Sequence, residues 1–234
     1  MKIFAISDLH MSVNNPKPMD IFGPVWDNYL DDIWADWAKK VTADDIVIVA
    51  GDISWAMTLE NSKADLDLIA KNAGKKIIIR GNHDYWWSSI SKIRNILESD
   101  MYAIQNDCLK FGDTIFCGTR GWSVPEGYAP QSPQNQKILD REVIRLELTL
   151  KAAKEQQKDG EKIICIMHYP PFNNRQHDSA FTKLIEHYGV HSVVYGHLHG
   201  AKYVKNPIKL VKNGITYYLT SCDMLQNKLI EIEI

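Results

Sequence analysis

Five short motifs built from aspartate, histidine, asparagine and glycine occur in a fixed order along this 234-residue chain. They are Asp8-Leu9-His10, Gly51-Asp52, Gly81-Asn82-His83-Asp84, His168 and Gly196-His197-Leu198-His199. The first three directly follow short apolar runs that are typical of buried β-strands. Because ligands in open α/β folds gather at the carboxyl edge of a sheet, the motifs constrain the chain to a fold that brings these strand ends into one pocket.

The rest of the chain supports this interpretation, because apolar runs alternate with segments of helical periodicity. We expect strands at 2–7, 45–50, 75–80, 114–118, 162–167 and 191–195. We expect helices at 27–40, 59–70, 90–97, 134–158 and 181–187. This alternation predicts an α/β fold.

The C-terminal part of the chain has a different pattern. Short strand-like segments at 202–204, 208–211, 215–219 and 228–232 are separated by Asn-Pro and Asn-Gly pairs. Such pairs are typical of tight turns between neighbouring strands. We therefore expect an antiparallel meander at the end of the chain.

The most irregular segment is 120–136, which is rich in glycine, proline, serine and glutamine. We interpret it as a candidate lid or specificity loop, and the alternative is an exposed connection with no role in the chemistry. No flexible linker or internal repeat interrupts the chain. A length of 234 residues then predicts a single domain over 1–234.

Charge and cysteine content exclude several classes of protein. Lysine and arginine total 27 against 29 acidic residues, so the basic excess of most nucleic-acid-binding proteins is missing and we expect no nucleic-acid partner. The four cysteines form no CxxC pair, which argues against a zinc ribbon or a disulfide scaffold. The N-terminus reaches Asp8 before a signal-peptide segment could form, and no apolar run has transmembrane length. We expect a cytoplasmic protein without a membrane partner.

The motifs supply imidazole, carboxylate and one neutral amide oxygen as ligand types, with no thiolate. This mixture suits manganese, iron or zinc and argues against copper(I) or an iron–sulfur cluster. Two divalent ions held by four neutral imidazoles and the carboxylates of Asp8 and Asp52 would leave the site about two charges positive. Such a site favours a phosphate group as its ligand.

The order D-x-H, G-D, G-N-H-D, H and G-H-x-H resembles that of the calcineurin-like metallophosphoesterase superfamily. The resemblance implies a metallophosphoesterase-type αββα sandwich of two mixed β-sheets flanked by helices. It also implies two divalent or trivalent metal ions. By the same resemblance the ligands of one ion are Asp8, His10 and His199, those of the other are Asn82, His168 and His197, and Asp52 bridges the two.

The resemblance further implies hydrolysis of a phosphomonoester or phosphodiester by attack of a hydroxide that bridges the two metals. No covalent phosphoenzyme is needed. His83 would donate a proton to the leaving oxygen or stabilise the transition state. Asp84 would keep the His83 ring oriented and cationic.

Two departures separate the chain from the protein serine/threonine phosphatases of this superfamily. Asp52 is followed by Ile53-Ser54-Trp55 rather than by a longer motif with a phosphate-binding arginine, and Met11 rather than glycine follows His10. The pattern is more similar to small bacterial phosphoesterases, including class III cyclic-nucleotide phosphodiesterases. We expect a small phosphorylated substrate, a nucleotide being one candidate. The alternative is a non-catalytic metal-binding interaction module that retains the fold.

Aromatic and basic residues near the motifs leave two questions open. Trp55, Trp86, Trp87 and Trp122 either form a stacking wall for a planar ligand or pack in the core behind the metal loops. Arg120 either reaches a substrate phosphate or has a structural role.

Overall fold

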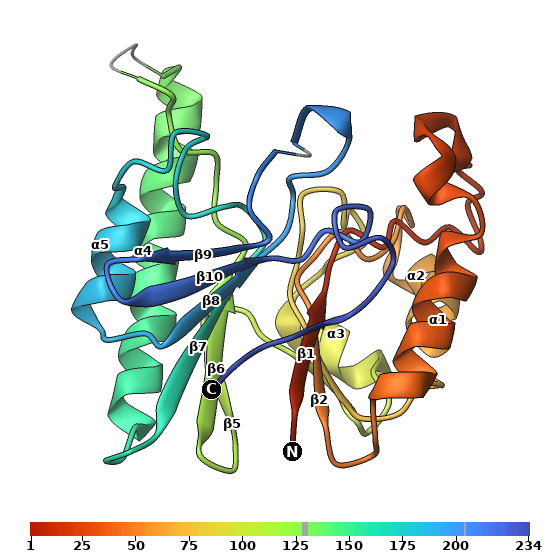
Figure 1. Cartoon of the computed structure of the whole chain (residues 1–234), viewed down its shortest axis with the longest axis horizontal. Helices are drawn as coiled ribbons and strands as arrows, with labels where there is room; N and C mark the ends of the chain where they lie inside the picture. The colour runs from red at the N-terminus through yellow and green to blue at the C-terminus, as the bar shows by residue number, and fades with distance from the viewer. Residues whose placement is uncertain (128–130, 204) are drawn as a thin grey trace.

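The computed structural model describes residues 1–127, 131–203 and 205–234. Two mixed β-sheets pack face to face at its centre, and helices cover the outer face of each sheet (Figure 1). The expected α/β class, with an αββα sandwich of two mixed sheets, is confirmed.

The first sheet contains five strands in the order β11-β1-β2-β3-β4. Their bounds are Ile230–Glu231 for β11, Ile3–Ile6 for β1, Ile46–Val49 for β2, Lys75–Ile78 for β3 and Met101–Ala103 for β4. Strands β1 to β4 are parallel, and β11 pairs antiparallel with β1. Every residue of β1 and β2 is buried, as expected for continuous apolar runs in a parallel sheet covered on both faces.

The second sheet contains six strands in the order β5-β6-β7-β8-β10-β9. Their bounds are Cys108–Phe111 for β5, Thr114–Thr119 for β6, Lys162–Met167 for β7, Ser192–Tyr195 for β8, Ile215–Leu219 for β10 and Lys209–Lys212 for β9. The four inner strands are parallel. The two edge strands, β5 and β9, pair antiparallel with their neighbours.

Three apolar layers hold the sandwich together. Between the sheets lie side chains such as Ile3, Ile48 and Ile164. The outer face of the first sheet packs on α1 (Tyr29–Lys40), α2 (Leu59–Ala70) and α3 (Ile90–Ile96), and that of the second on α4 (Pro133–Gln156) and α5 (Ala180–His187). In the described part of the chain, no helix has both the length and the apolar character that crossing a bilayer requires.

Helix α4 begins inside the segment 120–136 because the sequence places a cap and a proline there. The Ser132 hydroxyl accepts a hydrogen bond from the amide of Asn135 at 3.2 Å, and Pro133 takes the first helical position. Proline suits this position because an amide hydrogen there would have no partner in the helix. The candidate lid therefore ends in a helical turn, and its residues 128–130 lie outside the described part of the chain.

The predicted C-terminal meander is wrong in its pairing. Residues 202 and 203 lie in the 3-10 turn η3 (Ala201–Tyr203) rather than in a strand, and residue 204 is outside the described part. Strand β10 pairs parallel with β8 and antiparallel only with β9. The last strand, β11, joins the other sheet. Alternation of apolar residues predicts that a segment is extended, but it does not identify the partner strand.

Candidate metal centre

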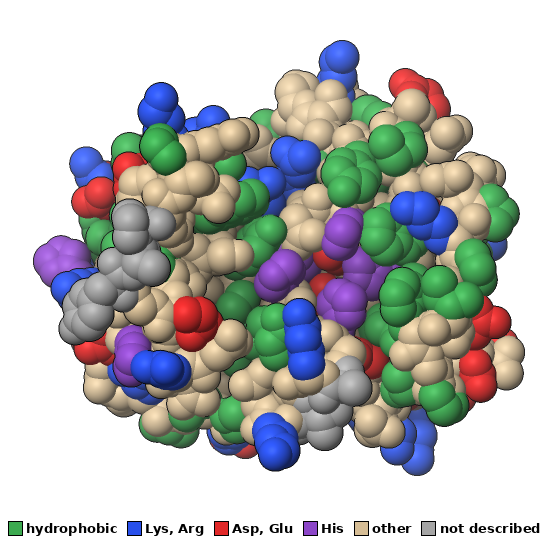
Figure 2. Space-filling view, turned by 90° about the horizontal axis from the view of Figure 1, so that it is seen from above, with side chains coloured by type: hydrophobic (Ala, Val, Ile, Leu, Met, Phe, Trp, Pro, Cys, Tyr) green, Lys and Arg blue, Asp and Glu red, His purple; other side chains and the backbone are tan. Residues whose placement is uncertain are grey.

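The predicted ligand residues lie where parallel strands of both sheets end. In the first sheet Ile6 pairs with Val49, and Val49 pairs with Ile78, so β1, β2 and β3 end at the same level. In the second sheet His168 directly follows β7, and its carbonyl accepts a hydrogen bond from the amide of Gly196 at 3.1 Å. Figure 2 looks onto this edge and shows histidine and acidic side chains gathered in one hollow.

Asp8, His10 and His199 form the first group of donors. One ligand atom from each lies within 4.8 Å of the others. The Asp8 and His10 side chains are buried, and the ring centroids of His10 and His199 are 5.2 Å apart. These are the three residues that the resemblance assigns to one metal ion.

Asn82, His168 and His197 form the second group. The side-chain oxygen Oδ1 of Asn82 lies 2.8 Å from Nε2 of His168 and 2.8 Å from Nδ1 of His197. Three donor atoms therefore converge on one point from two loops of the second sheet and one loop of the first. These are the three residues that the resemblance assigns to the other ion.

Asp52 lies between the two groups. Its Oδ2 atom is 3.4 Å from Nε2 of His168 and 3.9 Å from Nε2 of His10. Its Oδ1 atom accepts a hydrogen bond from the amide of His83 at 2.7 Å. Asp8, Asp52 and His168 also place one ligand atom each within 4.8 Å of the others. Asp52 therefore lies between the two groups of donors, where the resemblance places the bridging ligand.

Four of these residues have a backbone conformation that side chains other than glycine rarely adopt. The φ angles are +58° at Asp8, +47° at His10, +50° at Asp52 and +69° at His197. A left-handed conformation costs a residue other than glycine about 1 to 2 kcal/mol. Strained residues persist where the surrounding structure holds them, and they concentrate at functional sites.

Two glycines allow the loops to approach each other. A Cβ atom on Gly81 would lie 2.1 Å from Oδ1 of Asp52, and one on Gly196 would lie 2.3 Å from the hydroxyl of Ser7. Both separations are far below van der Waals contact. Only glycine therefore fits at these two positions without moving a ligand loop.

The charge states of the donors differ before a metal ion binds. Burial lowers the pKa of His10 and that of His197 to about 4, so both rings are neutral at pH 7. Burial would also lower the pKa of His168, but the negative charge of Asp52 outweighs it and raises this pKa to about 9. Burial opposes ionisation of Asp52, yet the positive charge of His168 brings the pKa of this carboxyl below its usual range.

Several donor atoms of the cluster have no hydrogen-bond partner. Among the described residues, both ring nitrogens of His10, Oδ2 of Asp52 and Nδ1 of His83 are buried without one. Leaving such an atom unsatisfied costs about 1 to 3 kcal/mol. Metal ions would satisfy the atoms of the first two residues, and the imidazole, carboxylate and amide donors suit manganese, iron or zinc. The residues therefore fit the implied metal centre.

His83 lies at the edge of the donor cluster and is partly buried. Its ring centroid is 5.6 Å from that of His10 and 4.5 Å from that of Trp55. Burial lowers the pKa of His83, which favours the neutral form of the ring. The ring is placed beside the metal ligands without belonging to them.

Asp84 has a different role from the predicted one. Its Oδ1 atom accepts hydrogen bonds from the amides of Ile53 and Ser54 and from the indole of Trp86, and its Oδ2 atom accepts one from the amide of Gly81. No hydrogen bond joins Asp84 to the His83 ring among the described residues. The carboxylate fastens the loop after β2 to the loop after β3, which fixes Asp52 and Asn82 relative to each other.

The tryptophans divide between the two alternatives. Trp86 and Trp87 are 2% and 6% exposed and pack in the core. Trp55 is partly buried, and its ring stacks on that of His10 with a centroid distance of 4.8 Å. Trp122 is partly buried in the loop after β6. Of these four tryptophans, Trp55 is the one whose ring packs directly on a predicted metal ligand in the described part of the chain.

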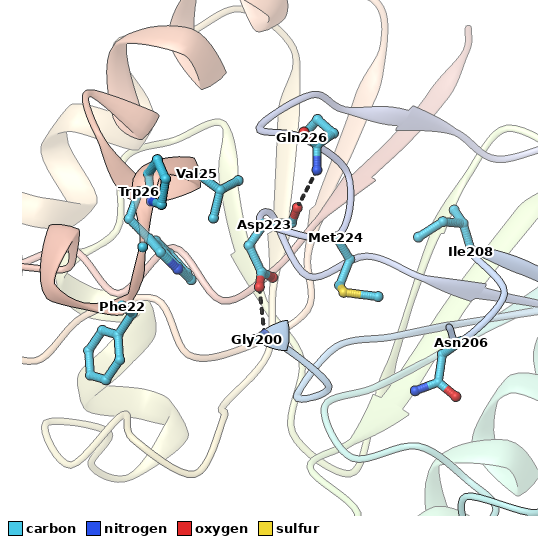
Figure 3. Close-up of a pocket in the computed structure, with 11 residues that line it drawn as sticks. Phe22, Val25, Trp26, Gly200, Asn206, Ile208, Asp223, Met224 and Gln226 are labelled. Atoms are coloured by element: carbon cyan, nitrogen blue, oxygen red, sulfur yellow. Dashed lines mark hydrogen bonds between the residues drawn. The ribbon is translucent and has the colours of Figure 1, made fainter. Parts of the chain in front are cut away.

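Sequence reasoning missed an apolar pocket of about 400 Å³ beside the cluster. Trp26 lines it from the 3-10 turn η2 (Pro24–Trp26), which follows η1 (Asp20–Phe22). The Trp26 ring centroid is 6.2 Å from those of His10 and His199. Figure 3 shows Trp26 and Asp223 on this pocket, with Asp223 accepting a hydrogen bond from the amide of Gly200 at 2.7 Å. Trp26 and Asp223 belong to no motif, so their positions became visible only in the fold.

Comparison with known proteins gives one family. The family model described as calcineurin-like phosphoesterase matches residues 1–201. The chain is similar to TT1561 of Thermus thermophilus, with 11% identity, a TM-score of 0.55, and coverage of 99% of this chain and 97% of that chain. It is also similar to the protein of unknown function AQ665 from Aquifex aeolicus, with 13% identity, a TM-score of 0.49, and coverage of 98% and 95%.

No curated protein matches the sequence. At 11% identity the Thermus structure supports the fold alone. The family model covers most of the chain and includes all five motifs. The chain therefore belongs to the calcineurin-like phosphoesterase family of metal-dependent hydrolases that act on phosphoric ester bonds.

Proposed function

We propose that this protein hydrolyses a small phosphomonoester or phosphodiester at a centre of two metal ions. The observation that carries the proposal is the convergence of seven donors from both sheets, with Asp52 between the groups that contain His10 and His168. A non-catalytic interaction module would be expected to lose some of these donors. All seven are present, which supports the enzyme.

We assign the seven donors to two ions. Asp8, His10 and His199 would hold one ion, Asn82, His168 and His197 would hold the other, and Asp52 would contact both. When bound, the two ions would supply an activated water molecule near neutral pH and neutralise charge on the phosphoryl oxygens. The ions are manganese, iron or zinc by donor chemistry.

His83 acts on the substrate rather than on the ions. Burial lowers its pKa and favours the neutral ring, which keeps one N–H group. The ring stands beside His10 with its Nδ1 atom unpartnered among the described residues. We assign His83 the role of donating a hydrogen bond to a phosphoryl or leaving-group oxygen, which stabilises the charge that develops there.

The apolar pocket beside Trp26 is suited to the organic part of the ester. It adjoins His199 through Gly200, and its lining includes Ile208 and Met224. Apolar walls exclude water and favour a planar or aliphatic leaving group. A nucleoside is one candidate, and the pocket does not by itself distinguish a monoester from a diester.

The test compares an aryl phosphomonoester with an aryl phosphodiester after loading with manganese, iron or zinc. We expect metal-dependent turnover of at least one compound. Asp52→Asn should lose most turnover together with bound metal, because a bridging charge is removed. His83→Ala should keep its metal and lose turnover by about 10² or more. Absence of turnover in the wild type with every metal would contradict the proposal.

Matched variants separate these effects from a general loss of charge. Asp159 and His187 are both exposed and lie outside the five motifs. Asp159→Asn and His187→Ala should therefore match the wild type in metal content and in turnover. If Asp52→Asn and His83→Ala behaved like these two controls, the assigned roles would be wrong.

A further inference from the structure

A second cavity, of about 220 Å³, lies at the ends of β3 and β6 and is lined by four arginines. Arg80 follows β3 and directly precedes the motif that begins at Gly81, and Arg120 directly follows β6. Arg141 and Arg145 lie one turn apart on α4, with Arg141 exposed at the surface. We call this cavity the arginine pocket.

The arginine pocket carries a large excess of positive charge. Glu142 is the one acidic residue in its lining as described, and its side chain has no exposed surface. The Glu142 carboxylate is already shared, because it accepts hydrogen bonds from Arg145 at 2.6 Å, from Thr119 at 2.9 Å and from Arg120 at 3.5 Å. One carboxylate among four guanidinium groups leaves a net charge of about three positive units.

Two of the guanidinium groups have unused donors. The Nε atoms of Arg80 and Arg120 are buried with no hydrogen-bond partner among the described residues. Both groups are positively charged and line the same cavity, so they repel each other. An oxyanion would satisfy the donors and offset the repulsion, because guanidinium groups bind phosphate and carboxylate oxygens in pairs.

The arginine pocket shares its backbone with the metal centre. The carbonyl of Arg120 accepts hydrogen bonds from the amides of His168 at 3.1 Å and Tyr169 at 2.9 Å. The ring centroid of Tyr169 is 4.1 Å from that of His197. The residue after Arg80 is the glycine that packs against Asp52. The loops that line the arginine pocket therefore also position residues of the metal centre.

We propose that the arginine pocket binds a second oxyanion of the substrate, a phosphate or carboxylate, while the scissile ester lies at the metal centre. The inference rests on the proposed phosphoesterase activity and narrows its substrate class to molecules with two anionic groups. Arg141 guides and holds the second group from the mouth of the pocket. A free inorganic anion is the other occupant that the chemistry allows, and the experiment separates the two.

The first measurement is calorimetric titration of inorganic phosphate into protein held in a chelator at constant ionic strength. Saturable binding is expected in the wild type, with about tenfold weaker binding in Arg141→Gln. Lys151→Gln removes one charge from an exposed position on the same helix and should bind as the wild type does. No saturable binding in the wild type, or equal affinity in Arg141→Gln, would overturn the proposal.

The second measurement uses phenyl phosphate and phenyl phosphates that carry a phosphonate on alkyl spacers of increasing length. A phosphonate cannot be hydrolysed, so each compound has a single scissile ester. For at least one spacer, kcat/KM of the wild type should exceed its value for phenyl phosphate by about tenfold. Arg141→Gln should bring the two values of kcat/KM close together, and Lys151→Gln should keep the tenfold difference. Equal ratios in the wild type and Arg141→Gln for all spacers would refute the substrate role and leave a site for a free anion.

The two measurements test the phosphoesterase activity and the arginine pocket separately. If the metal-loaded wild type hydrolysed none of these compounds, the proposed phosphoesterase activity would be contradicted. The phosphate titration would still decide whether the arginine pocket binds an oxyanion, because it needs neither metal nor turnover. Arg80→Gln provides a second variant at the inner end of the pocket, where weaker phosphate binding than in the wild type is again expected.

Discussion

Nε2 of His168 lies 3.4 Å from Oδ2 of Asp52, and neither side chain has any exposed surface. Because Asp52 raises the pKa of His168 to about 9, the ring is protonated at pH 7 before a metal ion binds. Nδ1 of the same ring lies 3.0 Å from the carbonyl oxygen of Ala50. Nδ1 can therefore keep its proton and donate it in a hydrogen bond to Ala50, while Nε2 loses its proton and becomes a metal ligand.

We expect metal binding at pH 7 to release about one proton from His168. Protons and metal ions compete for Nε2 below pH 9, so the apparent affinity should rise between about pH 6 and about pH 8. Calorimetric titration of zinc in buffers with different ionisation enthalpies measures the proton count. His168→Gln should release about one proton fewer than the wild type, and an equal count in both proteins would contradict this charge state.

Asp84→Asn is expected to destabilise the fold even without metal. An amide has a single acceptor oxygen, so its NH₂ group would face either the Gly81 amide or the three donors that include the Trp86 indole. The expected loss in the free energy of unfolding is about 1 to 3 kcal/mol. Urea denaturation of the chelated protein measures it. An unchanged unfolding midpoint would show that Asp84 does not fasten the two loops.

Gly81→Ala should reduce metal binding more than overall stability. The new methyl group would meet Oδ1 of Asp52 at 2.1 Å and its backbone nitrogen at 2.2 Å, so the Asp52 loop must move away from the position between the two donor groups. Gly127→Ala is the matched control, because a Cβ atom at Gly127 would meet nothing within 4 Å. Metal content per chain after dialysis is the measurement. Equal metal content in the two variants would argue against a tightly fitted loop.

Asp45 supplies a test of acid stability away from the metal centre. Burial opposes its ionisation, but hydrogen bonds from the amides of Lys2 and Thr42 lower its pKa below the usual 3.8. A carboxyl whose pKa is lowered in the folded state stabilises the protein above the unfolded pKa, and the effect disappears as the pH falls through the folded value. Asp45→Asn should therefore lose stability at pH 7 and lose progressively less below about pH 4.

Denaturant unfolding at a series of pH values checks this dependence. Asp44→Asn changes the exposed neighbour in the same turn and is expected to unfold as the wild type does at each pH. If the difference in unfolding free energy between Asp45→Asn and the wild type stayed constant down to low pH, the hydrogen bonds from the two amides would not act through the charge of Asp45.

The sequence predicted those parts of the fold that local patterns control. Strands such as β2 and β7 are short apolar runs, and their burial on both faces follows from that composition. β4 has only three residues, and no residue of β5 is fully buried. Neither strand therefore shows a clear alternation of apolar and polar residues in the sequence. The partner of β11 lies more than 200 residues away in the chain, and local periodicity holds no information on such pairing.

In the candidate site, too, features set by the local sequence were predictable and features set by distant contacts were not. All seven predicted ligands meet because each lies just after a strand whose neighbours are fixed by the sheet. The role of Asp84 could not be predicted, because its partners Ile53 and Ser54 come from another loop. The arginine pocket combines Arg80 with Arg141 from a helix, and no motif spacing connects these two positions.

The donors come from both sheets, with Asp52 on the first and His168 and His199 on the second. Ions bound there would cross-link the two sheets, because the sheets could not slide past each other without breaking metal coordination. The last of these donors is the 199th residue of the chain. The first group of donors can therefore assemble only when the loops that follow β1 and β8 have come together.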